Sequence, residues 1–213
     1  MSTFDETFSL PLPRGAFGKY AVRGWQDDLA IAVGFSLAAE NVAKGWIEQK
    51  DDLLVPPILY LYRHSIELSL KWCIRLAARM AVNDGYAGQE NLSPATVDEK
   101  LVTHRIAELA DRLNRYIGFI TSATPTHKLD RGTLKQLRDL DAEDQFGDTY
   151  RYATHTTGAA VHTSVERIDF HQRFDALNKL ANLLHGEADH LQSLAGLMAE
   201  AAEEVPDLGE IEP

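Results

Sequence analysis

The sequence of 213 residues predicts an all-α protein, a bundle of four to five main helices with a short extended loop or hairpin before the last helix. Long segments repeat apolar residues at the spacing of a helix face, and prolines and glycines separate these segments. The composition, 45% hydrophobic and 25% charged, is sufficient to bury a core. A chain of this length is expected to form a single domain.

The helix boundaries follow from the same signals. Pro56 and Pro57 begin the second segment, because proline is tolerated in the first turn of a helix. Thr103 is an alternative start of the third helix, as a cap whose partner is the backbone amide of Ala107 or of an adjacent residue. The predicted helices cover residues 27–48, 57–80, 97–120, 132–145 and 171–204.

The helical domain is expected over residues 24–204, between two segments of different composition. Residues 1–23 hold prolines and glycines, which predict an irregular N-terminal arm. Residues 205–213 are acidic and contain proline, which is typical of a disordered tail. Glycines and β-branched residues in 146–170 favour the extended loop or hairpin.

The net charge of −11 is unevenly distributed. No Lys or Arg follows Lys179, and eight of the 32 acidic residues lie beyond residue 180, so the 21 basic residues before it face 24 acidic ones. Acidity therefore does not exclude nucleic acid as a partner.

The single cysteine, Cys73, lies among apolar residues and fits a core position in a reducing cytoplasm. No secretory signal or membrane span of about 18 apolar residues is expected.

The stretch LYRHSIELSLKW, residues 61–72, places charges inside the most hydrophobic region. Residues four apart share a helix face, so the sequence predicts one charged row with His64 on the same side. A solvated face would explain the row through pairs worth about 0.2–0.5 kcal/mol each. A row covered by another helix or subunit must instead be hydrogen-bonded and paired, an arrangement that suits an anionic ligand. The charged row consists of Arg63, Glu67, Lys71, Arg75 and Arg79.

Three segments carry a resemblance to a known family. YLYRHSIELSLKWCIRLA, residues 60–77, resembles the first core helix of the HEPN-like superfamily (higher eukaryotes and prokaryotes nucleotide-binding). VTHRIAELADRL, residues 102–113, is similar to the start of its next core helix, and DTYRYATHTTG, residues 148–158, to a loop of a prokaryotic defence-type subgroup. The resemblance covers about residues 55–185 and implies a helical bundle, often dimeric, in toxin, antiphage or RNA-processing systems.

Many members of that superfamily cleave RNA without metal through an arginine followed by a histidine after four to six residues. This sequence departs from the motif, because only three residues separate Arg151 from His155 and Arg167 from His171.

Ribonuclease chemistry without metal needs a base, an acid and a cation facing the phosphorane. We expect Glu67 to orient His64, its neighbour one turn away in the helix. Alternatively, His104 bonds to backbone at a helix start, and Arg151 anchors its loop by pairing with Asp144 or Asp148. The predicted catalytic residues are His64, Glu67, His104, Arg151 and His155, and the predicted ligand-binding residues are Arg63, Lys71, Arg75 and Tyr152.

No metal or cofactor is expected, because the Glu187-x-x-His190 pair lacks the second copy that a di-metal bundle requires. The leading hypothesis is an RNA-directed or nucleotide-directed protein of a bacterial defence or stress system, a divergent metal-independent endoribonuclease. The alternative is a non-catalytic helical module that forms a homodimer or binds a partner protein of such a system. Both hypotheses place the protein in the cytoplasm.

Overall fold

The computed structural model describes residues 27–121, 127–145, 147–152 and 168–203. These residues form six α-helices and one short 3-10 helix, η1, and contain no strand, which confirms the predicted all-α class. The predicted arm, the tail and residues 153–167 of the predicted hairpin lie outside the described residues. The helices are α1 (Asp28–Gln49), η1 (Asp52–Leu54), α2 (Val55–Asn83), α3 (Pro94–Lys100), α4 (Ile106–Ile117), α5 (Arg131–Glu143) and α6 (Phe170–Glu203).

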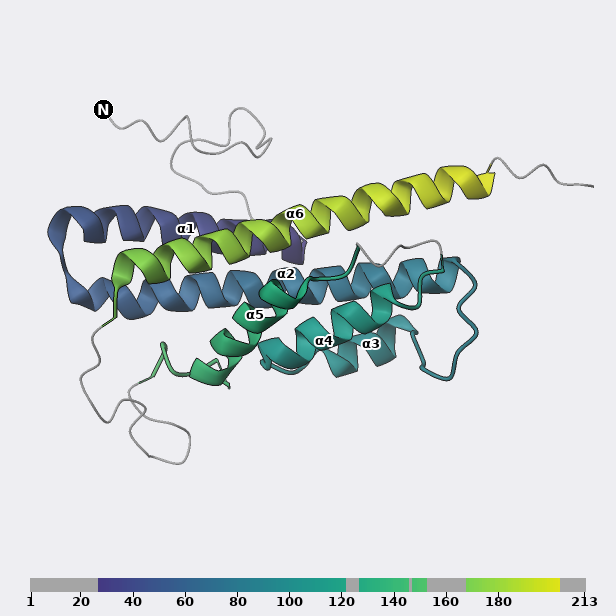
Figure 1. The fold of residues 1–213 in the computed structure, drawn as a ribbon, viewed down its shortest axis with the longest axis horizontal. Coiled ribbons are helices and arrows are strands. Elements are labelled where there is room, and N and C mark those ends of the chain that lie inside the picture. Colours follow the sequence, from purple (N-terminus) through teal and green to yellow (C-terminus); the bar gives the residue numbers. More distant parts are fainter. Residues whose placement is uncertain (1–26, 122–126, 146, 153–167, 204–213) are drawn as a thin grey trace, which may run out of the picture.

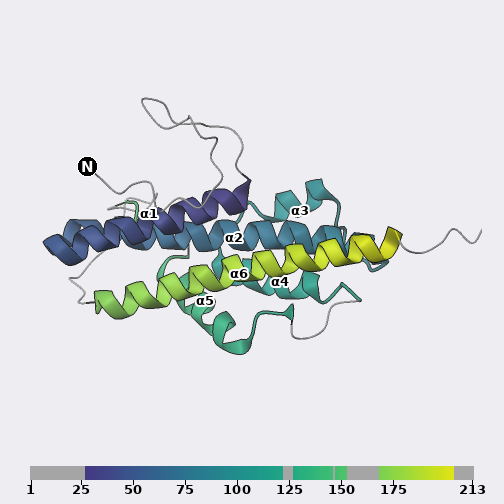
Figure 2. The same cartoon turned by 90° about the horizontal axis from the view of Figure 1, so that it is seen from above.

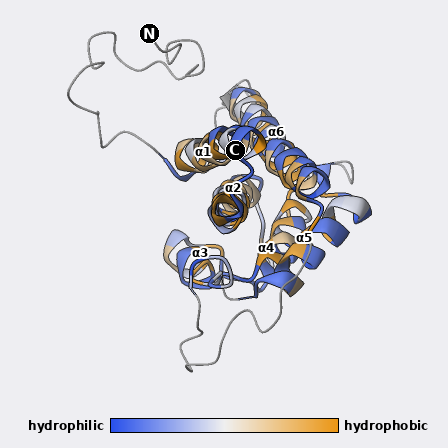
Figure 3. Ribbon diagram, turned by 90° about the vertical axis from the view of Figure 1, so that its left-hand side faces the viewer, coloured by the Kyte–Doolittle hydropathy of each residue, from blue (hydrophilic) through white to orange (hydrophobic). Residues whose placement is uncertain are grey.

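Helix α2 is the centre of the bundle. Seen along the bundle, α1 and α6 lie on one side of α2 and α3 and α4 on the other, with α5 beside α4 (Figure 3). Helix α6 runs along most of α2, and α1 lies beside its N-terminal part (Figure 1, Figure 2). Tyr62 of α2 is fully buried, and its hydroxyl donates to Asn178 Oδ1 of α6 at 3.3 Å. The apolar side of α2 also buries Cys73, so its predicted core position is confirmed.

The helix starts follow local chemistry. Pro56 and Pro57 lie in the first turn of α2, as predicted. Asp27 caps α1 by accepting a hydrogen bond from the amide of Ala30 at 2.8 Å. Asp130 caps α5 through the amides of Gly132 and Thr133.

The prediction of one helix over residues 97–120 is wrong, because the segment forms two helices, α3 and α4. The alternative start at Thr103 is nearer to the structure, since α4 begins at Ile106. Thr103 Oγ1 accepts a hydrogen bond from the amide of Arg105 at 3.0 Å, two residues before the place expected for the capped amide. The carbonyl of His104 accepts a hydrogen bond from the Arg63 side chain at 2.7 Å. These hydrogen bonds take the place of helical ones and hold residues 102–105 in an irregular conformation.

Candidate functional site

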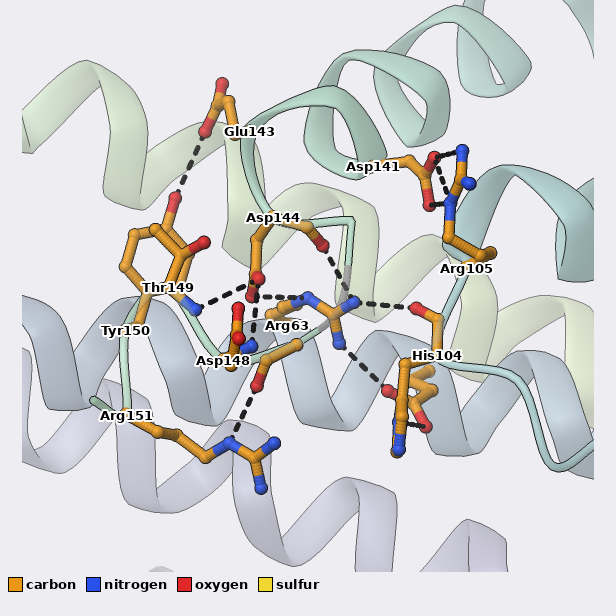
Figure 4. A network of polar contacts seen from close by, with 12 residues as sticks. Arg63, His104, Arg105, Asp141, Glu143, Asp144, Asp148, Thr149, Tyr150 and Arg151 are labelled. Carbon is orange, nitrogen blue, oxygen red and sulfur yellow. Dashed lines mark hydrogen bonds and ion pairs between the residues drawn. The ribbon is translucent and has the colours of Figure 1, made fainter. Parts of the chain in front are cut away.

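Arg63 is the centre of a buried polar network (Figure 4). The residue is 1% exposed, and its Nη1 donates to Glu67 Oε2 at 2.8 Å. Its Nη2 donates to the carbonyl oxygens of His104 and Asp144 at 2.7 and 3.0 Å, and its Nε lies 2.8 Å from Asp144 Oδ2. The solvated-face alternative is therefore wrong for Arg63 and Glu67, since the segment before α4 and the segment after α5 contact them and both side chains are buried.

The segment after α5 is built around this arginine. Asp144 Oδ1 accepts hydrogen bonds from the amides of Asp148 and Thr149 at 3.0 and 3.1 Å. Gly147 has a φ of +71°, and a Cβ at this position would lie 3.1 Å from Arg63 Nη1. Glycine is the residue that tolerates both the positive φ and the close approach. Arg63 thus holds Asp144 and Gly147 in place, and Asp144 in turn holds Asp148 and Thr149.

The same segment presents Arg151 to α2. Arg151 Nε donates to the carbonyl of Gly147 at 2.7 Å, and its guanidinium lies 5.4 Å from the ring centre of Tyr60 and 5.1 Å from that of Tyr152. His64 stacks on the same Tyr60 ring at 5.6 Å. Arg151 and His64 therefore meet at one aromatic side chain.

His64 lies in a partly buried and positively charged environment. Burial lowers the pKa of this imidazole, and the charges of Arg63, Lys71 and Arg151 act in the same direction against the opposing charge of Glu67. The expectation that Glu67 orients His64 is not met, because no hydrogen bond joins the two among the described residues.

Glu67 orients His104 instead. The carboxylate is 2% exposed, and its Oε1 lies 3.0 Å from His104 Nδ1 and accepts a hydrogen bond from Lys71 Nζ at 2.8 Å. Burial alone would raise the pKa of Glu67, but the bond from Lys71 and the neighbouring charges of Lys71, His104 and Arg63 lower it. An ionised carboxylate only accepts hydrogen bonds, so Nδ1 of His104 is the donor.

This geometry leaves the other ring nitrogen of His104 unprotonated in the neutral imidazole. The His104 side chain is 52% exposed, whereas the Lys71 side chain is 12% exposed. The arrangement is a buried carboxylate that holds a surface imidazole, with an ammonium group beside it. Chemically, such a pair can accept a proton at Nε2 of His104 while Lys71 faces negative charge.

The structure brings most of the predicted site residues together and separates one of them. Arg75 pairs with Asp28 of α1 and Asp98 of α3, and its side chain is 39% exposed. It forms part of a surface ion-pair cluster, three helical turns along α2 from Arg63. His155 lies outside the described residues. The residues that gather around Glu67 and Tyr60 are Arg63, His64, Lys71, His104, Arg151 and Tyr152.

Sequence analysis missed two residues of the site. Asp144 was considered only as a partner for Arg151, and Gly147 only as a loop residue. The available signal was an acidic residue at the end of a predicted helix followed by a glycine, which is typical of an ordered turn.

Within the described ranges, no group of three or more His, Cys, Asp or Glu side chains could hold a metal ion. The same ranges contain no helix with the length and apolar character needed to cross a membrane.

Comparisons of this chain with protein-family models, with curated proteins and with solved structures gave no match. The fold and site by themselves define a class: an all-α bundle in which a buried ionic network supports a surface imidazole.

Proposed function

We propose that this protein acts on RNA or nucleotides as a divergent, metal-independent endoribonuclease of a bacterial defence or stress system. The observation that carries the proposal is the contact between buried Glu67 and exposed His104, with Lys71 on the same carboxylate oxygen. The assignment to a defence system is supported by the resemblance of residues 60–77, 102–113 and 148–158 to the HEPN-like superfamily.

The proposed reaction follows from the accessible groups. Nε2 of His104 takes the proton of a ribose 2′-hydroxyl, and the oxygen attacks the adjacent phosphorus. The bond to the 5′-oxygen breaks, giving a 2′,3′-cyclic phosphate and a 5′-hydroxyl. Lys71 and Arg151 face the charge that develops on the phosphoryl oxygens. The leaving oxygen takes its proton from water, because the lowered pKa of His64 leaves that imidazole neutral. Arg63 and Glu67 are positioning residues, because their burial keeps them from the substrate.

The test is incubation of total RNA with the purified protein in the presence of EDTA. His104→Ala should lose cleavage by about 100-fold or more, the usual contribution of a proton-transfer group. His190→Ala is the matched control, since His190 is an exposed histidine on α6. Arg151→Ala should weaken RNA binding measured by fluorescence anisotropy. Absence of cleavage by the wild type, or equal cleavage by His104→Ala, would reject the enzymatic proposal.

A second candidate, a non-catalytic module that forms a homodimer, is favoured by helix α1. Its buried residues lie on one side, whereas partly exposed apolar residues lie on the other side together with exposed Asn41. A Cβ at Gly34 would meet no described atom within 4 Å, so a second helix could approach closely there. The partly exposed apolar residues of that side include Ile31, Leu37 and Ala38.

Sedimentation separates the two candidates. If α1 forms the dimer interface, Ala38→Arg should convert a dimer to a monomer, and Asn182→Arg on the exposed side of α6 should not. Addition of RNA should not change the sedimentation of either variant. A wild-type chain that sediments as a monomer would reject the dimer module.

A further inference from the structure

The C-terminal half of α2, the segment 84–93 and α3 follow one another along the chain (Figure 1). Their side chains line a second potential site. It is a cavity of about 730 Å³ that shares no residue with the Glu67–His104 site. This volume is within the range of about 300–1,000 Å³ that is typical of small-molecule pockets. Its apolar lining residues include Trp72, Ala78, Val82, Tyr86, Leu92, Pro94 and Val97.

The wall opposite α2 is fixed by packing. The Tyr86 ring stacks on Phe119 with ring centres 4.4 Å apart, and its hydroxyl accepts a hydrogen bond from the amide of Glu90 at 3.4 Å. A side chain at Gly88 would collide with the Tyr86 ring. The absence of a side chain at Gly88 therefore lets the chain fold against this aromatic wall.

Glu90 ties the same wall to two helices. Its Oε1 accepts hydrogen bonds from Lys100 Nζ of α3 at 2.8 Å and from the Tyr116 hydroxyl of α4 at 3.0 Å. Arg115 of α4 lies 3.5 Å from its other oxygen. The cavity is thus formed before any ligand binds, which lowers the entropic cost of binding.

The charged residues that line the cavity are Arg75 and Arg79 of α2, Glu90 of the segment 84–93 and Asp98 of α3, and both carboxylates are held in ion pairs. Arg75 is paired with Asp28 and Asp98, but exposed Arg79 forms no ion pair with any described residue. We propose that this cavity binds a small organic anion, with an apolar or aromatic body between Trp72 and Tyr86 and an anionic group on Arg79. Mostly apolar walls with one unpaired cation at the edge complement this class of ligand.

Two dyes that differ by one sulfonate test the proposal on the full chain. Anilinonaphthalene sulfonate is an aromatic anion, and N-phenylnaphthylamine is its neutral counterpart. Arg79→Gln should weaken binding of the anionic dye by about fivefold, the effect of one exposed ion pair, and leave the neutral dye unchanged. Arg79→Lys should retain most of the affinity for the anionic dye.

Variants of exposed apolar residues locate the dye. Val82→Arg should abolish saturable binding of both dyes, since Val82 lines the cavity. Leu197→Arg makes the same change at an exposed leucine of α6 that does not line the cavity, and it should bind like the wild type. Circular dichroism confirms that each variant is folded.

Several results would overturn the proposal. They are no saturable binding of the anionic dye to the full chain, equal affinity in Arg79→Gln and wild type, or undiminished binding in Val82→Arg. The variant Trp25→Ala tests whether the N-terminal segment of the chain occupies the cavity instead. This segment ends next to the cavity, because Asp27 Oδ2 accepts a hydrogen bond from Trp72 Nε1 at 3.2 Å, and Trp25 lies two residues before Asp27 in the sequence. Tighter dye binding by that variant would show that the chain's own N-terminal segment competes for the cavity.

Discussion

Arg63 of α2 and Asp144 at the end of α5 lie 81 residues apart in the sequence and form an ion pair with both side chains withdrawn from solvent. The same guanidinium binds Glu67, which in turn holds His104 at the surface. A buried pair of this kind is weak support for stability when it is compared with apolar residues, but removal of one partner is costly. Its function here is to position two segments against α2.

The first prediction concerns Arg63. Arg63→Met should lower the free energy of unfolding by about 3–5 kcal/mol, because Glu67 and Asp144 remain buried without their cation. Arg75→Met is the matched control, and its partly exposed ion pairs should contribute at most about 1 kcal/mol. Urea denaturation followed by circular dichroism measures both values. Equal losses would show that the Arg63 network does not hold the bundle together.

The second prediction compares two glycines. Gly147→Ala should lower the free energy of unfolding by about 1–3 kcal/mol, since alanine at a φ of +71° is strained and its methyl group approaches Arg63. Gly186→Ala should raise it by about 0.5–1 kcal/mol, because Gly186 lies inside α6 with no described atom within 4 Å of its Cβ position. Thermal denaturation of both variants checks the opposite signs. A stable Gly147→Ala would mean that the segment is not held against Arg63.

Sequence patterns predicted the helical class because each long helix has a local signature. Apolar spacing and the prolines at 56 and 57 are properties of neighbouring residues, and the structure confirms the helices they predict. The break between α3 and α4 was missed, since it depends partly on Arg63, which takes the carbonyl of His104 from 41 residues away. No local pattern contains that contact.

For the site, too, the sequence predicted what depends on neighbouring residues and missed what depends on long-range contacts. Spacing alone placed Arg63, Glu67, Lys71 and Arg75 on one helix face. It could not show that the first two are covered while Arg75 pairs with α1 and α3 at the surface. Likewise, the partner of Glu67 was expected one turn away at His64, but tertiary packing brought His104 to it.

The third prediction concerns pH. Burial lowers the pKa of His64 and of His185 below the ordinary value of 6.5, so these side chains bind fewer protons in the folded chain than in the unfolded chain. Their contribution to stability is present above about pH 6.5 and is lost as the pH falls through the folded pKa values. The free energy of unfolding should therefore decrease between about pH 7.5 and 5.5.

Variants isolate the two histidines. Replacing both His64 and His185 with Phe should flatten the decrease, and each single replacement should remove part of it. Glu187, whose pKa burial raises, acts with the opposite sign, but it is common to all variants and cancels in the comparison. Urea denaturation at several pH values provides the slopes. Equal slopes in the wild type and the double variant would contradict the prediction.

The fourth prediction concerns the proton of His104. The Glu67 carboxylate can only accept, so neutral His104 should carry its proton on Nδ1 and leave Nε2 as an acceptor toward solvent. Long-range ¹H–¹⁵N correlation spectra at about pH 8.5 distinguish the two ring nitrogens by their chemical shifts. The Nε2–H form predominates in a free histidine side chain, so an Nδ1–H signal would report the contact with Glu67 directly. Glu67→Gln should shift the tautomer balance toward Nε2–H, because a neutral amide oxygen is a weaker acceptor than a carboxylate. If wild-type His104 is already protonated on Nε2, that nitrogen cannot act as the base for a ribose hydroxyl, and the imidazole loses its assigned role.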